Sequence, residues 1–321
     1  MRQSRILPLL LLALIGALLW RTQPAAVPDF AALRRAPGSE AVLLARDGRV
    51  IAKLRTDPDR RRLDWVPLNA ISPALVQRLV AQEDRRFASH GGIDWRAVAG
   101  AARARLRGQG ARGASTITMQ LAGLIDPALG RAGGRGWRQK MAQARTARAI
   151  EARWTKAQIL EAWLNLLPFR GDLVGIDAAA RLMAGHSAAA ITPAEAAVFA
   201  ALARAPSAPA ERVLGRACRA APDLPCPAIE LAAARLLGPR SSIGGGDLAP
   251  HLAARLLTPG TTGAVRTTID ADIQRLARDA LARQLSALSP RNARDGAAVV
   301  VDNQTGEILA WVGAAGPGST A

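Results

Sequence analysis

The sequence predicts a mainly helical fold with short β-hairpins before and after the helical part. Half of the 321 residues are hydrophobic, which is enough to bury a core, and only 3% are aromatic. Alanine dominates, and alanine is the strongest helix former, whereas aromatic residues favour strands. From Ser72 to about Leu202 almost every local signal is helical. The length suits one large domain or two ordinary ones.

The chain opens with a basic and apolar pattern. Arg2 and Arg5 precede an uncharged run of fifteen residues, Ile6 to Trp20, and Arg21 follows. As a helix this run would be about 22 Å long, shorter than a ~30 Å hydrocarbon core. No good small-x-small cleavage site follows it. We therefore expect residues 1–26 to be an uncleaved signal anchor; a cleaved signal peptide is the alternative. An anchor would cross the inner membrane once, with the arginines in the cytoplasm and the rest outside.

Residues 27–70 are expected to form a stalk that contains a β-hairpin. Apolar runs flank Asp47 and Gly48, and glycine supplies the positive φ that such a turn needs. Residues 71–240 form the predicted helical domain. Ser72 and Pro73 fit a helix cap and first turn, and capping boxes begin at Thr155 and at Thr192.

Glycine-rich stretches interrupt the predicted helical pattern. Residues 108–113 and 130–136 are expected to be loops, and a Ser/Gly-rich stretch opens a linker over residues 241–264. The last segment, residues 265–321, is predicted to hold one helix, over 270–288, and one hairpin, over 297–312. Both are elements of an α+β arrangement.

The charge narrows the choice of partners. A formal net charge of +18 suits anionic partners such as nucleic acid, anionic lipid or a pyrophosphate. No helix-turn-helix, zinc-finger or aromatic stacking pattern is present, and the arginines are scattered. We predict a membrane or anionic-lipid partner and no nucleic acid. Cys218 and Cys226, the only cysteines, could form a local disulfide outside the cytoplasm or remain unpaired.

Glu83 is the strongest candidate for catalysis. It follows Leu79 by four residues and so continues the apolar stripe of the helix that opens at Ser72. A carboxylate at the edge of a core can act as a general base. A lone Glu on an apolar face is more often structural, but the surrounding block, residues 83–94 (EDRRFASHGGID), favours the functional interpretation. Asp84 turns about 100° away and is expected to be structural.

A second block, residues 113–120 (GASTITMQ), is predicted to turn into a helix capped by Ser115. Its exposed N–H groups and the hydroxyls of Ser115, Thr116 and Thr118 would suit an anion; simple helix capping is the alternative. A third block places Lys140 and Gln143 on one helix face, where they could hold a phosphate or be a solvated surface. A fourth block, residues 156–169, is mostly core, with Asn165 as a structural residue.

Together these four blocks resemble the family 51 peptidoglycan glycosyltransferases of the class A penicillin-binding proteins, over roughly residues 60–215. Residues 118–120 (TMQ), 166–171 (LLPFRG) and 250–255 (PHLAAR) are similar to the 1C branch of these proteins. Residues 265–270 and 305–313 resemble the opening of a penicilloyl serine transpeptidase domain. The resemblance implies a lysozyme-like helical fold for the glycosyltransferase domain.

The resemblance also implies an activity. The substrate would be lipid II, a disaccharide peptide linked to undecaprenyl pyrophosphate, and Glu83 would take the proton from the acceptor sugar's 4-hydroxyl. The expected partners are lipid II, the growing glycan strand, the inner membrane and other cell-wall synthesis proteins. The implied substrate-binding residues are Ser115, Thr116, Thr118, Gln120, Lys140 and Gln143.

Two departures from the family pattern matter. Gln143 stands where the family usually has a second essential carboxylate, and an amide carries no charge and cannot act as a base. The resemblance allows for Mg²⁺ or Mn²⁺ beside the pyrophosphate, but no residue here identifies a metal site. The transpeptidase motifs Ser-x-x-Lys, Ser-x-Asn and Lys-Thr-Gly do not follow residue 265, so we expect an incomplete transpeptidase region.

Two other functions stay open on the sequence. A lysozyme-like lytic enzyme needs a carboxylic acid near the glycosidic bond but no pyrophosphate site. A non-catalytic scaffold that binds lipid II would tolerate Gln143 and an incomplete second domain.

Overall fold

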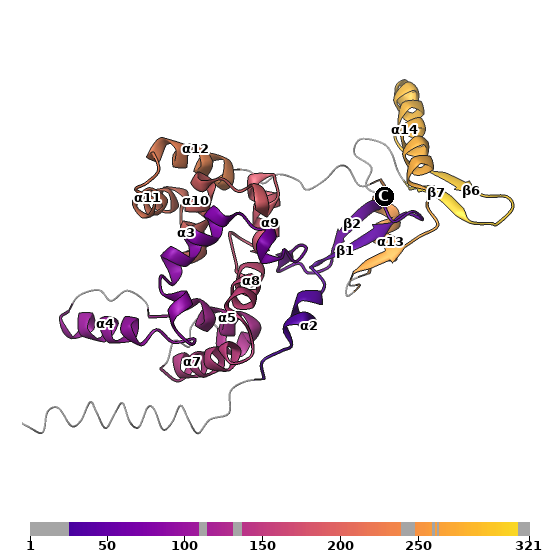
Figure 1. Cartoon of the computed structure of the whole chain (residues 1–321). Coiled ribbons are helices and arrows are strands. Elements are labelled where there is room, and N and C mark those ends of the chain that lie inside the picture. The colour runs from indigo at the N-terminus through magenta and orange to yellow at the C-terminus, as the bar shows by residue number, and fades with distance from the viewer. Residues whose placement is uncertain are drawn as a thin grey trace, which may run out of the picture. The chain divides into compact units, whose positions relative to one another are not determined.

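The computed structural model describes residues 26–108, 114–130, 137–238, 248–258, 261 and 263–313. The chain divides into two compact units, whose elements are labelled in Figure 1. The first, which we call the helical unit, contains Trp65–Ser241 and the residues up to Ala36. The second, the mixed unit, contains Pro37–Asp64 and Ser242–Ala321.

The helical unit confirms the mainly helical prediction. Its long helices are α3 (Pro73–Glu83), α4 (Trp95–Leu106), α5 (Ile117–Ile125), α7 (Trp137–Glu151), α8 (Lys156–Leu166), α10 (Pro193–Arg204), α11 (Ala210–Ala220) and α12 (Cys226–Leu237). Its short elements are α2 (Phe30–Arg35), α6 (Pro127–Gly130), α9 (Ile176–Ala179), strand β4 (Leu173–Val174), a π-helical turn (Ala180–Ala184) and 3₁₀ turns at Leu68–Ala70, Phe87–Ser89 and Ala188–Ala190.

The predicted helix starts are mostly confirmed. Helix α3 begins at Pro73 after Ser72, and the capping boxes at Thr155 and Thr192 are both formed. The cap of α5 was predicted wrongly: Thr116, not Ser115, accepts a hydrogen bond from the Met119 N–H, at 3.1 Å. The Ser115 hydroxyl instead accepts a hydrogen bond from a lysine of α7.

Helix α10 forms the centre of the helical unit. Its residues are buried without interruption from Glu195 to Leu202, and α3, α11 and α12 pack against it. Helix α5 packs in turn against α7 and α8. The many alanines let these helices approach closely while removing apolar surface from water, at roughly 25 cal/mol per Å². Glu83 stands at the end of α3, so packing in this core sets its position.

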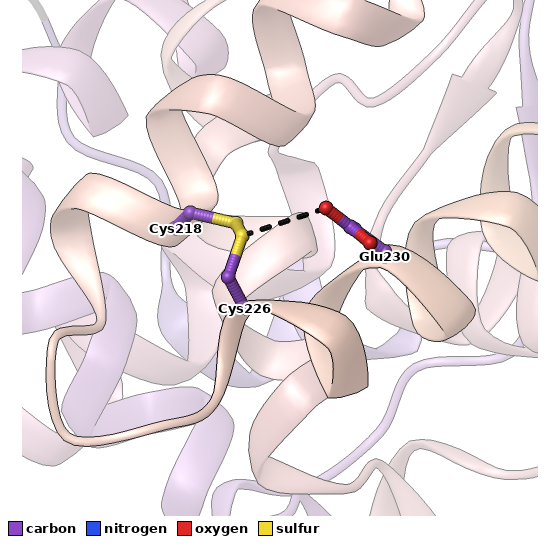
Figure 2. The surroundings of a disulfide bond; sticks show 3 residues. All are labelled: Cys218, Cys226 and Glu230. Carbon is purple, nitrogen blue, oxygen red and sulfur yellow. Dashed lines mark hydrogen bonds between the residues drawn. A yellow bond between two sulfur atoms is a disulfide. The ribbon is translucent and has the colours of Figure 1, made fainter.

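A disulfide joins α11 to the first residue of α12 (Figure 2). The sulfur atoms of Cys218 and Cys226 are bonded at 2.06 Å. The sequence left open whether these cysteines are paired, and in the structure they form a disulfide. A bridge that closes a short loop stabilises a fold mainly by restricting the unfolded chain.

The mixed unit combines strands with two helices. Its elements are β1 (Glu40–Leu44), β2 (Val50–Arg55), β3 (Arg61–Arg62), α13 (Pro250–Leu256), β5 (Ala264–Arg266), α14 (Ala271–Leu288), a 3₁₀ turn (Ser289–Arg291), β6 (Ala298–Val301) and β7 (Ile308–Val312). Strand β1 pairs with β2 in the antiparallel sense and with β5 in the parallel sense, and β6 pairs antiparallel with β7. Both predicted hairpins are therefore present.

The first hairpin shares a core with residues far along the chain. Leu43 and Ile51 are buried with Leu252 of α13 and Ile269 before α14. The hairpin that the sequence assigned to a stalk thus lies in the same unit as the C-terminal segment. Gln274 of α14 is completely buried and bonds to the backbone of Leu248 and Trp311, which ties α14 to β7.

The predicted signal anchor over residues 1–26 lies almost wholly outside the described residues, as do most of the two glycine-rich loops. Among the helices that the structure does describe, none combines the length and apolar character needed to cross a membrane.

Candidate active site

Two neighbouring carboxylates, Glu83 and Asp84, end helix α3 and have different surroundings. Asp84 is buried, and its Oδ2 accepts a hydrogen bond from the Ile117 N–H at 3.0 Å. Both of its oxygens lie 3.0 Å from Nε2 of His90. Because the Gly92 N–H donates to Nδ1 of His90, the ring proton is on Nε2 and is donated to Asp84. Asp84 is structural, as expected.

This arrangement bears on the predicted anion site. The N-terminus of α5 was expected to receive a phosphate, but Asp84 already places a carboxylate on its first N–H group. A negative charge is stabilised there by the helix dipole and the unpaired N–H groups. The protein's own side chain therefore occupies the end of the helix that the sequence assigned to a ligand.

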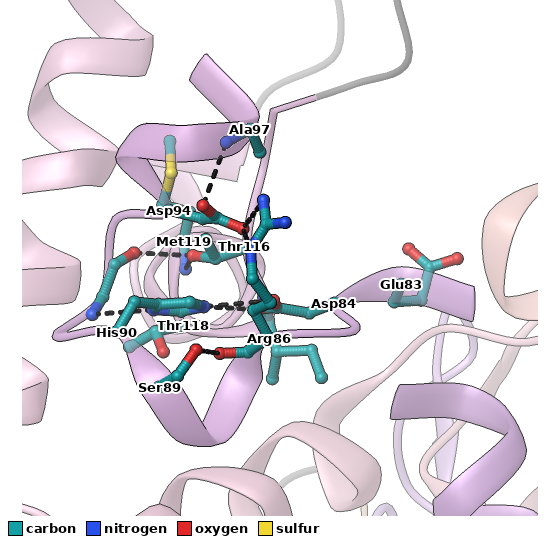
Figure 3. A network of polar contacts seen from close by, with 12 residues as sticks. Glu83, Asp84, Arg86, Ser89, His90, Asp94, Ala97, Thr116, Thr118 and Met119 are labelled. Carbon is teal, nitrogen blue, oxygen red and sulfur yellow. Dashed lines mark hydrogen bonds and ion pairs between the residues drawn. The ribbon is translucent and has the colours of Figure 1, made fainter. Parts of the chain in front are cut away.

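Glu83 points away from the network around Asp84 (Figure 3). Its Oε2 accepts a hydrogen bond from Nε2 of Gln120 at 2.9 Å. Its Oε1 is buried and has no hydrogen-bond partner among the residues that the structure describes. Buried polar atoms without partners are rare in folded proteins and cost free energy, so such an atom calls for an explanation. An oxygen kept available for a substrate hydroxyl is one explanation.

Gln120 connects Glu83 to the core. Its Oε1 accepts a hydrogen bond from Nε1 of Trp163, at 3.1 Å, and Trp163 is completely buried in α8. Gln120 was predicted to bind substrate, and the structure engages both ends of its amide within the protein.

Thr116 and Thr118 were also predicted to bind substrate. Both side chains are buried. The Thr116 hydroxyl donates to the Gly92 carbonyl and the Thr118 hydroxyl donates to Oε1 of Glu151, both at 2.6 Å. In the structure these two bonds connect α5 to its neighbours.

Ser115, Lys140 and Gln143 do come together, at the edge of the helical unit. The Lys140 ammonium donates to Oγ of Ser115 and to Oε1 of Gln143, each at 2.9 Å. Nε2 of Gln143 donates to the Leu129 carbonyl at 2.7 Å, which orients the amide with its oxygen towards Lys140. We call these three residues the Lys140 cluster. It offers a cation and a hydroxyl to an anion.

Some residues that hold the site were missed by the sequence analysis. Lys156 donates to the His90 carbonyl at 2.6 Å and to Glu151 at 2.8 Å, and its ammonium lies 4.4 Å from the centre of the Phe87 ring. It joins the segment after α3 to α7 and α8. The only signal for it was a lysine at the start of a predicted helix, which is common on surfaces.

Asp94 is the last residue of the segment that joins Glu83 to α4. It caps α4 through the Ala97 N–H, at 2.9 Å, and pairs with Arg86 at 2.7 Å (Figure 3). Burial by itself raises the pKa of Asp94, but the bonds from Ala97 and Arg86 outweigh it and hold the pKa below its ordinary value.

The side chains of the Lys140 cluster do not fit a metal site of their own. Mg²⁺ and Mn²⁺ prefer carboxylate and other oxygen ligands, and the cluster offers an ammonium, one hydroxyl and one amide. The described part of the chain contains no group of three or more His, Cys, Asp or Glu residues placed to hold a metal ion.

Fold and site together define a helical domain in which Glu83 has one oxygen bonded to Gln120 and α7 carries a cationic cluster. Residues 47–221 match the family model described as "Transglycosylase". The chain therefore belongs to the transglycosylase family.

Individual relatives agree with this assignment. A biosynthetic peptidoglycan transglycosylase from Rhodospirillum centenum is 44% identical over 45% of this chain and 59% of its own length. Penicillin-binding protein 1C from Escherichia coli is 31% identical over 85% of this chain and 36% of its own. The chain thus spans little more than half of the first relative and about a third of the second.

Among solved structures, penicillin-binding protein 1A from Haemophilus influenzae matches 84% of this chain and 32% of its own. The sequence identity is 16% and the TM-score is 0.34, too low for the overall superposition to inform the fold.

Proposed function

We propose that this protein is a peptidoglycan glycosyltransferase that polymerises lipid II into glycan strands. The observation that carries the proposal is the Glu83 carboxylate, with one oxygen bonded to Gln120 and the other buried without a partner in the described part of the chain. A general base needs a carboxylate oxygen that the protein itself does not use. Family membership supplies the class of reaction.

In this mechanism the 4-hydroxyl of the acceptor sugar gives its proton to Oε1 of Glu83. The hydroxyl oxygen forms a bond to the anomeric carbon of the growing chain. The bond from that carbon to the pyrophosphate oxygen breaks with inversion, and undecaprenyl pyrophosphate leaves with the electron pair. The Lys140 ammonium and the Ser115 hydroxyl stabilise the charge that develops on the pyrophosphate.

The proposed location is the outer face of the inner membrane, where the lipid-linked substrate lies. Helix α4 supports a membrane partner because it has no buried residue, and Trp95 and Leu106 are exposed beside Arg103 and Arg105. Basic and apolar side chains on one exposed helix suit an anionic lipid surface. We assign the protein to the 1C branch on the sequence features described above.

Polymerisation of purified lipid II in detergent tests the proposal. We expect the wild type to make glycan strands and Glu83→Gln to lose at least about 100-fold in rate, because a general base contributes 10²–10⁴-fold. The control is Glu211→Gln, the same change at an exposed glutamate of α11, which we expect to keep the wild-type rate.

Two outcomes would count against this function, and a third would count against the role of Glu83. If the folded wild type makes no glycan, the scaffold alternative is favoured. If it releases muropeptides from intact wall, the lytic alternative is favoured. If Glu83→Gln polymerises like the wild type, Glu83 is not the base.

A further inference from the structure

Two hydrogen bonds in series lead from the core to the proposed base. Trp163 Nε1 donates to Oε1 of Gln120, and Nε2 of Gln120 donates to Oε2 of Glu83. We infer that Trp163 and Gln120 are positioning residues for the reaction: Trp163 sets the direction of the Gln120 amide, and Gln120 holds Glu83 with one chosen oxygen available. This inference rests on the proposed function.

The direction of the amide follows from the chemistry of tryptophan. An indole N–H can only donate a hydrogen bond, so it must meet the amide oxygen of Gln120 and not the nitrogen. The nitrogen is then turned to Glu83. With the amide reversed, two N–H groups would face each other and an oxygen would face a carboxylate. Trp163 is completely buried, so it holds this direction firmly.

The effect on Glu83 is twofold. A donated hydrogen bond stabilises the ionised carboxylate, which is the form that accepts a proton. It also occupies Oε2 and leaves Oε1 as the oxygen with unused lone pairs. Asp84, one residue later, has partners on both oxygens, as a structural carboxylate should. The two carboxylates thus differ: the protein uses both oxygens of Asp84 and one oxygen of Glu83.

The same geometry gives Gln120 a role towards Glu83 in addition to the predicted substrate contact. Its amide oxygen meets Trp163 and its nitrogen meets Glu83. The nitrogen has two N–H donors, and the bond to Glu83 uses one of them. The Lys140 cluster is the part of the predicted residue set that supplies a cation to a phosphate.

Two substitutions in the full chain test the inference through pH–rate profiles at saturating lipid II. Gln120→Met keeps the length of the side chain and removes both hydrogen bonds. We expect its rate to fall about 10- to 100-fold. We also expect the acid limb of its profile to move to higher pH, because the ionised carboxylate has lost its donor. The KM for lipid II should stay close to that of the wild type.

Trp163→Phe keeps a ring in the core and removes only the indole N–H. We expect a loss of about 2- to 10-fold, the rate equivalent of one neutral hydrogen bond. Because Trp163 acts through Gln120, the double variant should be no slower than Gln120→Met alone. Trp154→Phe, the same change at another buried tryptophan, is the control, and thermal midpoints of all variants report folding.

The outcomes separate the inference from the function. An active wild type whose Gln120→Met variant keeps the wild-type acid limb would overturn the inference alone. So would additive losses in the double variant, since Trp163 would then act independently of Gln120. A wild type that makes no glycan would instead overturn the proposed function, on which the inference depends.

Discussion

Glu83 and Asp84 are adjacent in the chain, yet their surroundings give them opposite roles. The helix ends between them, so the second carboxylate turns towards α5 and takes the Ile117 N–H and His90 as partners. The first stays on the α3 face and accepts a hydrogen bond from Gln120. The end of the helix at Glu83 is therefore enough to separate a structural carboxylate from a candidate base.

The Lys140 cluster predicts how the protein responds to divalent cations. Gln143 offers a neutral amide oxygen, whereas a carboxylate there could share a Mg²⁺ ion with a pyrophosphate. We expect Gln143→Glu to make polymerisation more dependent on Mg²⁺ than the wild type, measured as the ratio of rates with Mg²⁺ and with EDTA. The exposed Gln77→Glu is the matched control. An unchanged ratio in Gln143→Glu would show that this position does not influence cation use.

Asp94 predicts a pH dependence of stability. Its folded-state pKa is lowered from the ordinary 3.8, because the bonds from Ala97 and Arg86 outweigh burial. A lowered pKa means that the charged form stabilises the fold above pH ~4 and that this contribution is lost as pH falls through the folded-state value.

We therefore expect Asp94→Asn to lower the thermal midpoint at pH 7, and we expect its difference from the wild type to narrow as pH falls below about 4. Asparagine keeps an oxygen for the helix cap, so the comparison isolates the charge. Thermal melts across this pH range, with Glu211→Gln as the exposed control, provide the measurement. A gap between wild type and variant that widens towards low pH would contradict the assignment.

At the scale of single elements, the sequence predicts the features that depend on residues close together in the chain. The caps of α8 and α10 were predictable because both partners of each capping box lie within three residues. The cap of α5 was not, since Ser115 and Thr116 are both suitable hydroxyls. Contacts with Lys140 and Gly92, 25 and 24 residues away, decide between them. The role of Trp163 could not be predicted for the same reason. A tryptophan in an apolar stripe is typical of a hydrophobic core, and its partner Gln120 is distant in the sequence.

The loop after α3 provides a test at this scale. Gly92 has φ +91°, and a Cβ there would lie 3.0 Å from the backbone of Ala147 in α7, whereas a Cβ on Gly91 would meet nothing within 4 Å. We expect Gly92→Ala to destabilise the protein by about 1–3 kcal/mol through backbone strain and crowding. Gly91→Ala should be close to neutral. Urea unfolding of the two variants makes the comparison, and equal midpoints would contradict the role of Gly92.

At the scale of the whole molecule, the mixed unit is built from segments about 200 residues apart. Arg49 in the first hairpin bonds to Asp272 of α14 at 2.7 Å, and β1 pairs with β5. Local sequence patterns predicted both hairpins and helix α14, but they could not predict this pairing, and they assigned the residues of α13 to a linker. A stalk was the natural interpretation because nothing near the hairpin in sequence covers its apolar side.

This architecture predicts that the helical unit cannot be isolated by a single cut. A chain that ends at Gly238 keeps β1 and β2 but loses α13, β5 and α14, so Leu43 and Ile51 lose their buried partners. Each such side chain accounts for about 1.5–3 kcal/mol of burial. We expect this truncated protein to associate and to bind a hydrophobic dye, as measured by light scattering and dye fluorescence. A second truncation that also replaces residues 37–64 with a Gly/Ser segment should stay monomeric, because it removes the exposed apolar strands. If the first truncation is already monomeric and free of dye, the hairpin does not depend on the C-terminal segment for its burial.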